Sequence, residues 1–185
     1  KDKIGPIHCS FAGAGLSGAK LNRTILNHVD LSNSNMMRAD ISNASLIRSN
    51  LSHSILIGAI LRGSDLRFAY LEAASLRHAH IVFAKLNGAF LKQATLDNAR
   101  IHISNFNYAS LEGASLKKAE LSDIDLSKTF LKDADFEDAI FVYYQYVHDE
   151  TKDRETYDRI INMLMERPED KRPKTGPASF EAHVK

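Results

Sequence analysis

Tryptophan is absent from this chain of 185 residues, and phenylalanine and tyrosine together bring the aromatic content to only 8%. Large rings are therefore not expected to dominate the core. Cysteine occurs once, at Cys9, which excludes an internal disulfide and is typical of a reducing compartment. We expect the Cys9 thiol to be buried in a small inward-facing slot rather than to act as a nucleophile.

Long apolar runs are also missing: none approaches the roughly 20 residues that span a bilayer, and no signal peptide is visible. Neither charge dominates, because 24 Lys and Arg stand against 23 Asp and Glu. We therefore expect neither a membrane nor a nucleic acid as partner. The composition resembles that of cytosolic proteins and is also compatible with secretion into a host cell. The first residue is Lys1 rather than methionine, which predicts a fragment or a processed form.

What the sequence does contain is a five-residue period. Every fifth residue from Phe11 to Phe141 is apolar, and a small residue stands two positions earlier in nearly every unit, with Val29 and Ile124 as the largest exceptions. A period of five would scatter these residues around an α-helix and send them to alternate faces of a flat strand. The pattern therefore predicts a solenoid, in which the chain turns within each unit and returns every leucine to one interior.

Units such as ADISN at 39–43, ASLKK at 114–118 and ADFED at 134–138 resemble the A-(D/N)-L-x-x pattern of the pentapeptide-repeat family. The resemblance covers residues 9–143. It implies an all-β solenoid, a right-handed quadrilateral β-helix of about seven coils. Four units would form one square coil, with the central Leu or Phe and the small residue pointing inward.

The chain is expected to contain a pentapeptide-repeat β-helix over 9–148, a capping α-helix over 149–167, and a linker or disordered tail over 168–185. The helix is predicted from one apolar face, formed by Tyr157, Ile160, Ile161, Leu164 and Met165, and from Pro168, which ends it. It would cover the last coil, where the interior and strand edges are otherwise exposed. The alternative is a dimerisation helix, so the chain is expected to be a monomer or a dimer through this segment.

Stacked coils allow outward positions to be mapped by adding twenty. This mapping places aromatic residues at one corner on neighbouring coils, with further apolar residues on what we expect to be an adjoining face. The corner residues are Phe68, Tyr70, Phe90, Tyr108 and Phe130, and the adjoining ones are Phe83 and Ile103. Outward aromatics are unusual on a solvated face. They predict either packing between coils or a strip that binds a protein partner.

Catalysis finds little support, and we predict no enzyme activity, cofactor or metal for this segment. Carboxylates are plentiful, but a convex rod offers no cleft to desolvate them. We expect instead a protein–protein interaction or scaffold module. Some bacterial effectors carry such a β-helix as the substrate-recognition domain of an attached ubiquitin-ligase-like module, and the linker-like tail is compatible with that context.

The alternative function comes from a resemblance to quinolone-resistance pentapeptide proteins, which imitate DNA and bind topoisomerases. That role would require a long acidic surface. Residues 1–108 hold 12 Lys and Arg against 6 Asp and Glu, whereas residues 109–148 hold 4 against 8. Only the last coils are therefore acidic, which favours the interaction module over the DNA mimic.

Overall fold

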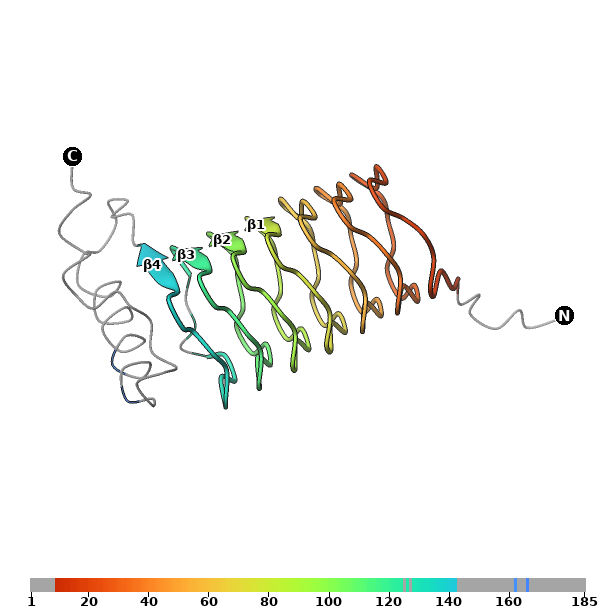
Figure 1. Ribbon diagram of the computed structural model, residues 1–185. Helices are drawn as coiled ribbons and strands as arrows, with labels where there is room; N and C mark the ends of the chain where they lie inside the picture. Colours follow the sequence, from red (N-terminus) through yellow and green to blue (C-terminus); the bar gives the residue numbers. More distant parts are fainter. Residues whose placement is uncertain (1–8, 125, 127, 143–161, 163–165, 167–185) are drawn as a thin grey trace, which may run out of the picture.

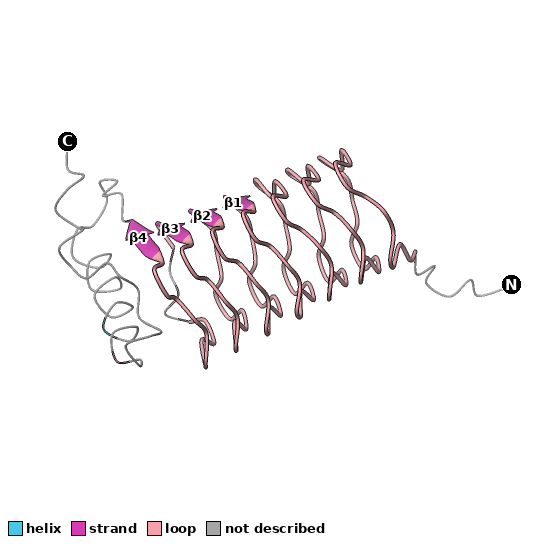
Figure 2. Cartoon of the chain, viewed as in Figure 1, coloured by secondary structure: helices cyan, strands magenta, loops and turns pink. Residues whose placement is uncertain are grey.

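The computed structural model describes residues 9–124, 126, 128–142, 162 and 166. The described residues between 9 and 142 wind into a rod of stacked coils that follow one another from the N-terminal to the C-terminal end (Figure 1). The named strands are short: β1 (His80–Val82), β2 (Arg100–His102), β3 (Glu120–Ser122) and β4 (Ile140–Val142). Figure 2 shows these strands side by side along one edge of the rod.

Neighbouring coils pair in parallel with a constant offset of twenty residues. Ile81 on β1 lies opposite Ile101 on β2, and β2 with β3 and β3 with β4 keep the same offset. The offset continues outside the named strands, in isolated bridges such as Ser75 with Thr95. Four five-residue units therefore make one coil, and the predicted all-β solenoid is confirmed for the described residues.

Most corners of the coils are tight turns; at the Phe83 corner the Ala84 amide donates instead to Ser104 Oγ of the next coil, at 3.1 Å. In a representative turn the amide of Ala79 donates to the carbonyl of Leu76 at 3.0 Å, and His78, just before Ala79, has a φ of 57°. A positive φ at this position is typical of a type II turn and is least strained for Gly, Asn and Asp. Most such positions carry glycine or a polar residue. The bulky exceptions are Phe68, Phe83, Ile103 and Tyr108, with φ values of 58°, 56°, 46° and 63°.

The interior consists of the central apolar residue and the small residue of each unit. Leu76 and Ala79 are fully buried, as are their equivalents in the neighbouring coils. Where the small residue is serine, its hydroxyl donates within the turn, as from Ser34 Oγ to the Leu31 carbonyl at 2.6 Å. The buried hydroxyl is thereby satisfied. The predicted inward orientation of both positions is confirmed.

The N-terminal coil differs from the rest because, among the described residues, it has a neighbouring coil on only one side. Leu16, Leu21 and Leu26 are consequently only partly buried. Cys9 is exposed, so the prediction of a buried thiol is wrong. Its position in the repeat is inward-facing, but at this end no second layer covers it.

The predicted helix over 149–167 and the tail over 168–185 lie outside the described residues, apart from Asn162 and Glu166, and so does the end of the predicted β-helix over 143–148. No helix in the described part of the chain is long and apolar enough to cross a membrane. Within the same part, no group of three or more His, Cys, Asp or Glu is placed to hold a metal ion.

Candidate functional site

The five corner aromatics occupy two parallel columns along the rod. We call Phe68, Tyr70, Phe90, Tyr108 and Phe130 together the aromatic strip. The twenty-residue register places Phe68 and Tyr108 in the corner column, and Tyr70, Phe90 and Phe130 in the column on the next face. Only one inward-facing alanine, such as Ala69, separates the two columns along the chain. The structure therefore brings these five residues together, as the sequence predicts.

All five rings of the aromatic strip reach solvent. Phe68, Tyr70 and Phe90 expose a little under half of their surface, whereas Tyr108 and Phe130 each expose 63%. Aromatic side chains bury large areas when they find a partner. The strip therefore exposes apolar ring surface that packing between coils does not cover.

Stacking orders the face column of the strip. The rings of Tyr70 and Phe90 lie on adjacent coils with centroids 5.0 Å apart and planes at 10°. Ser110 follows in the same column and Phe130 comes after it. Part of the ring area thus packs between coils, while the outer edges of the rings stay free. Both interpretations of the strip, packing and binding, find support here.

Each ring of the corner column has a cation on its outer side along the rod. The Arg48 guanidinium lies 5.8 Å from the Phe68 ring centroid, and the Lys128 ammonium lies 6.0 Å from that of Tyr108. Sequence reasoning missed these cation–π pairs, although each is separated by the same twenty residues that align the aromatics. Such cation–π contacts hold the rings in place, while the rings stay exposed and the cations stay charged.

Gly88 lies between Phe68 and Tyr108 in the corner column. A Cβ added there would meet the Phe68 ring at 2.7 Å, so the ring leans over this glycine. We predict that Gly88→Ala lowers the free energy of unfolding by about 1–3 kcal/mol, because the ring must move and because φ is +65°. Urea unfolding followed by circular dichroism would measure the loss.

The matched control is Gly113→Ala, which has the same φ of +65° but whose nearest neighbour is Gln93 Cγ at 3.6 Å. The backbone cost is shared by both variants, so the difference between them isolates the displaced ring. Equal losses at Gly88 and Gly113 would contradict the proposed position of Phe68.

Phe83 and Ile103 do not join the aromatic strip. They lie at the preceding corner of the coil, and one whole face separates them from Phe68 and Tyr108. Along the rod this intervening face carries polar side chains: Ser45, Asp65, Lys85 and Asn105. Phe83 has its own cation, since the Arg62 guanidinium lies 5.6 Å from the ring centroid. The seven predicted residues thus form two separate exposed groups.

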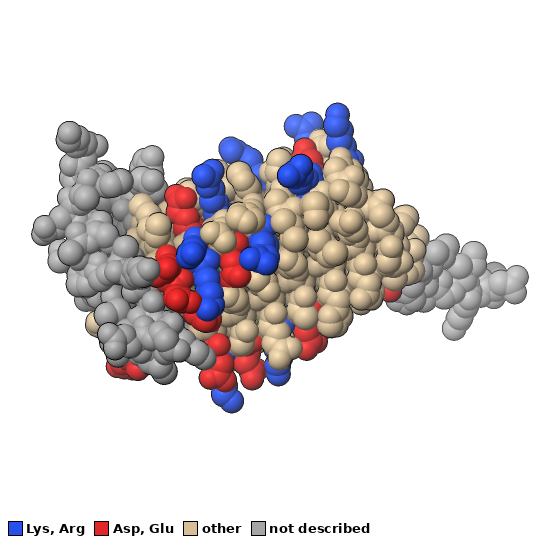
Figure 3. All heavy atoms as spheres, in the orientation of Figure 1, with Lys and Arg blue, Asp and Glu red and all other residues tan. Residues whose placement is uncertain are grey.

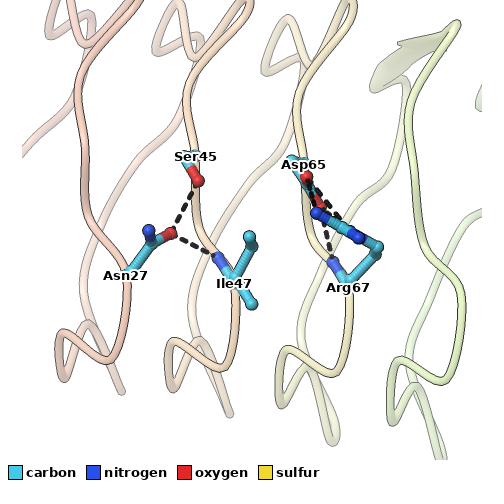
Figure 4. Close-up of polar contacts among 5 residues, drawn as sticks. All are labelled: Asn27, Ser45, Ile47, Asp65 and Arg67. Atoms are coloured by element: carbon cyan, nitrogen blue, oxygen red, sulfur yellow. Dashed lines mark hydrogen bonds and ion pairs between the residues drawn. The ribbon is translucent and has the colours of Figure 1, made fainter.

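Figure 4 shows how the intervening face satisfies its polar groups internally. Asn27 Oδ1 accepts from Ser45 Oγ at 2.7 Å and from the Ile47 amide at 2.9 Å. Asp65 accepts from the Arg67 guanidinium and amide, with the shortest contact 2.8 Å from Nη2. Burial alone would raise the pKa of Asp65, but the hydrogen bonds from Arg67 outweigh it and hold the pKa below its usual value. The Asn27 amide oxygen and the Asp65 carboxylate are therefore already hydrogen-bonded within the chain.

Two further aspartates cap turns in the same way. Asp30 accepts from the Ser32 amide and Asp40 from the Ser42 amide, each at 3.0 Å. Hydrogen bonds from these serines lower the pKa of both carboxyl groups, and Lys20 adds to the effect at Asp40. The carboxylate form of each aspartate therefore stabilises the turn that it begins.

A pH dependence follows from these three lowered pKa values. Because Asp30, Asp40 and Asp65 have lower pKa values in the folded chain, their contribution is present above the unfolded pKa of about 4. It is lost as the pH falls through the folded values. We expect the unfolding midpoint in urea to fall on acidification below about pH 4.

The variant with all three aspartates changed to Asn keeps an acceptor oxygen in each turn but cannot be protonated. It should lose less stability than the wild type between pH 5 and pH 3 in the same urea titration. Identical acid sensitivity in the two proteins would show that other groups control the loss of stability at low pH.

Charge on the rest of the rod is unevenly distributed. In Figure 3, charged side chains gather toward the C-terminal part of the described rod, while much of the N-terminal part of this face is uncharged. Among the acidic residues of the last coils, Glu137 and Asp135 both pair with Lys117, at 2.7 and 3.2 Å. Glu137 first and then Asp135 raise the pKa of Lys117 above its usual value. Part of the acidic surface is thus neutralised within the chain.

Comparison with known proteins identifies the repeat. A family model described as pentapeptide repeats, in 8 copies, matches residues 14–52, 44–81, 74–102 and 104–141. A search of curated proteins found no significant match.

Several solved structures are similar to this chain. Rfr23, a pentapeptide repeat protein from the cyanobacterium Cyanothece 51142, is 32% identical over 53% of this chain, with a TM-score of 0.45. The match covers 64% of Rfr23, so the chain spans less than two thirds of that protein. A trypsin-treated variant of QnrB1, a plasmid-mediated fluoroquinolone resistance protein, is 17% identical over 82% of this chain and 71% of its own, with a TM-score of 0.65. At this identity the similarity to QnrB1 shows the fold alone.

Proposed function

Because the chain belongs to the pentapeptide-repeat family, whose coils form a right-handed quadrilateral β-helix, we propose that it is a non-enzymatic module that binds a protein partner through the aromatic strip. The observation that carries this proposal is the half-exposed set of rings, held in two columns on neighbouring coils. Phe83 and Ile103 form a second, separate exposed group and are proposed only as secondary contacts.

Rigidity supports the strip as a binding surface. Backbone hydrogen bonds within the strip connect each coil to the coils before and after it, for example from the Tyr70 amide to the Ser49 carbonyl at 2.9 Å and from the Leu71 amide to the Phe90 carbonyl at 2.7 Å. Rings fixed on such a scaffold lose little conformational freedom on binding, which is why aromatics are enriched at binding hot spots.

Backbone conformation gives independent support. Phe68 and Tyr108 occupy positive-φ positions at which glycine or asparagine would be less strained. A bulky aromatic residue at such a position carries a local backbone cost, which supports a role for these two rings beyond forming the turn. In a longer polypeptide with a ubiquitin-ligase-like domain, the same strip would select the substrate.

The DNA-mimicking alternative is less well supported by the described surface. Mimicry requires a continuous run of free carboxylates, whereas here Asp65 pairs with Arg67, and Asp135 and Glu137 share Lys117. The balance of positive charge over residues 1–108 would also repel a basic DNA-binding track.

The strip is tested by changing Tyr70, Phe90 and Tyr108 together to Ser. We expect the amount of partner captured from a lysate to fall at least tenfold, because three adjacent anchors are lost. The melting temperature should change by only a few degrees, since these rings are half-exposed. Capture and melting are measured on the same preparation.

The control changes His78, Asn98 and Lys118 to Ser. These residues form the equivalent column half a coil away, at the diagonally opposite corner, with φ values of 57°, 56° and 56°. Capture should be unaffected in this variant. A strip variant that melts far lower and yet captures the same partners would assign the aromatics to packing instead.

A further inference from the structure

Two cations lie at the two ends of the corner column. Arg48 precedes Phe68 by one coil, and Lys128 follows Tyr108 by one coil. Within the part of the chain that the structure describes, neither has a carboxylate at ion-pair distance. By contrast, Arg67 is paired with Asp65. The corner column therefore presents two positive charges with rings between them.

Among the residues that the structure describes, the columns beside the strip do not cancel these charges. On one side, Asp65 is already engaged by Arg67. On the other side the outward column alternates in sign along Glu72, Lys92, Glu112 and Lys132, and Lys92 approaches Glu112 at 3.7 Å. Asp30, which precedes the aromatics in the face column, keeps its negative charge, but it lies two coils before Tyr70 and is hydrogen-bonded to Ser32 and Asn50. The surface of the strip is thus apolar in the middle and positive at both ends.

We propose that the partner segment that docks on the aromatic strip is an acidic peptide with apolar residues between its carboxylates, lying along the rod axis. This inference rests on the proposed function and specifies the chemistry of its partner. Arg48 is suited to the task, because its guanidinium lies over the Phe68 ring and its N–H groups can bind a carboxylate in a bidentate manner.

The geometry fixes the spacing of the carboxylates. Arg48 and Lys128 are four coils apart, and coils stack at strand spacing, so their backbones are separated by about 19 Å. An extended peptide advances about 3.3 Å per residue. The two acidic residues should therefore lie about six positions apart, with apolar side chains between them on Tyr70, Phe90 and Tyr108. Single-stranded nucleic acid also uses rings and cations, and the test below separates it from the peptide.

The probe is a phage-displayed library of random 12-residue peptides, selected on the wild-type chain. We expect enriched peptides to carry two Asp or Glu about six positions apart with apolar residues between them. Fluorescently labelled copies of these peptides and a labelled dT12 oligonucleotide are then compared by fluorescence anisotropy. Enrichment of neutral or basic peptides, no enrichment, or tighter binding of dT12 than of the peptides would each overturn the proposal.

A double variant tests whether Arg48 and Lys128 bind the carboxylates of the peptide. Arg48→Gln combined with Lys128→Gln should weaken binding of the selected peptides on the order of tenfold, and the wild-type affinity should fall as salt rises. The matched control combines Arg38→Gln with Lys118→Gln, because these two cations have the same four-coil spacing at the diagonally opposite corner. It should bind as the wild type does. Urea midpoints confirm that both double variants are folded.

The outcomes distinguish this inference from the proposed function. If the Tyr70, Phe90 and Tyr108 variant loses the peptides while the Arg48 and Lys128 variant keeps full affinity, the strip binds partners but not through acidic residues. If the aromatic variant keeps full affinity, the strip is not the docking surface and the proposed function fails.

Discussion

Replacing Leu76 by Ala should lower the free energy of unfolding by about 2–5 kcal/mol. The Leu76 side chain is fully buried between its equivalents Leu56 and Leu96 on the two neighbouring coils. Truncation removes packing on both sides and leaves a cavity that a close-packed interior cannot readily fill. Urea or guanidinium unfolding followed by far-UV circular dichroism measures the change.

Arg77→Ala is the control for the first prediction. Arg77 is the next residue along the chain, and its side chain is exposed at the corner. Its loss should change the unfolding free energy by only about 0.5 kcal/mol or less. Similar losses at Leu76 and Arg77 would contradict the division of each unit into inward and outward positions.

Ala79→Leu should be destabilising for the opposite reason. Ala79 is fully buried, its amide closes the turn to Leu76, and the next residue, His80, bonds back to the Ala59 carbonyl at 2.9 Å. The backbone on both sides is thus fixed and cannot retreat from a larger side chain. Overpacking of this kind typically costs about 1–3 kcal/mol and occasionally more.

Ala12→Leu makes the same change at an exposed position and should be nearly neutral. The two leucine variants are compared in one unfolding experiment. If Ala79→Leu were as stable as Ala12→Leu, the corner would have room that the structure does not show, and the small residue would not be required by packing.

The twenty-residue register and the orientation of the core could be predicted from sequence because they depend on one strict period. The position of each central apolar residue and of each small residue follows from its distance along the chain to the previous one. This spacing is sufficient to predict which residues stack on one another. The five residues of the aromatic strip followed from the same addition of twenty. This part of the site is therefore as predictable as the fold.

Three features could not be read from the period. Cys9 has an inward repeat position, but its burial depends on whether a second coil covers it, and none does in the described residues. Phe83 and Ile103 were expected to adjoin the strip, whereas a complete polar face lies between the two corners. The lean of Phe68 over Gly88 depends on a side-chain rotamer, which a repeat pattern does not specify.

Site-specific photocrosslinking tests most directly whether the aromatic strip is a binding surface. The benzophenone amino acid p-benzoylphenylalanine is placed at Tyr108 in one protein and at Asn98, on the diagonally opposite corner, in another, and both are irradiated in cells of the source organism. The account predicts a discrete crosslinked polypeptide from position 108, none from position 98, and loss of the product when Tyr70 and Phe90 are changed to Ser. No product at 108, or the same product from both corners, would contradict it.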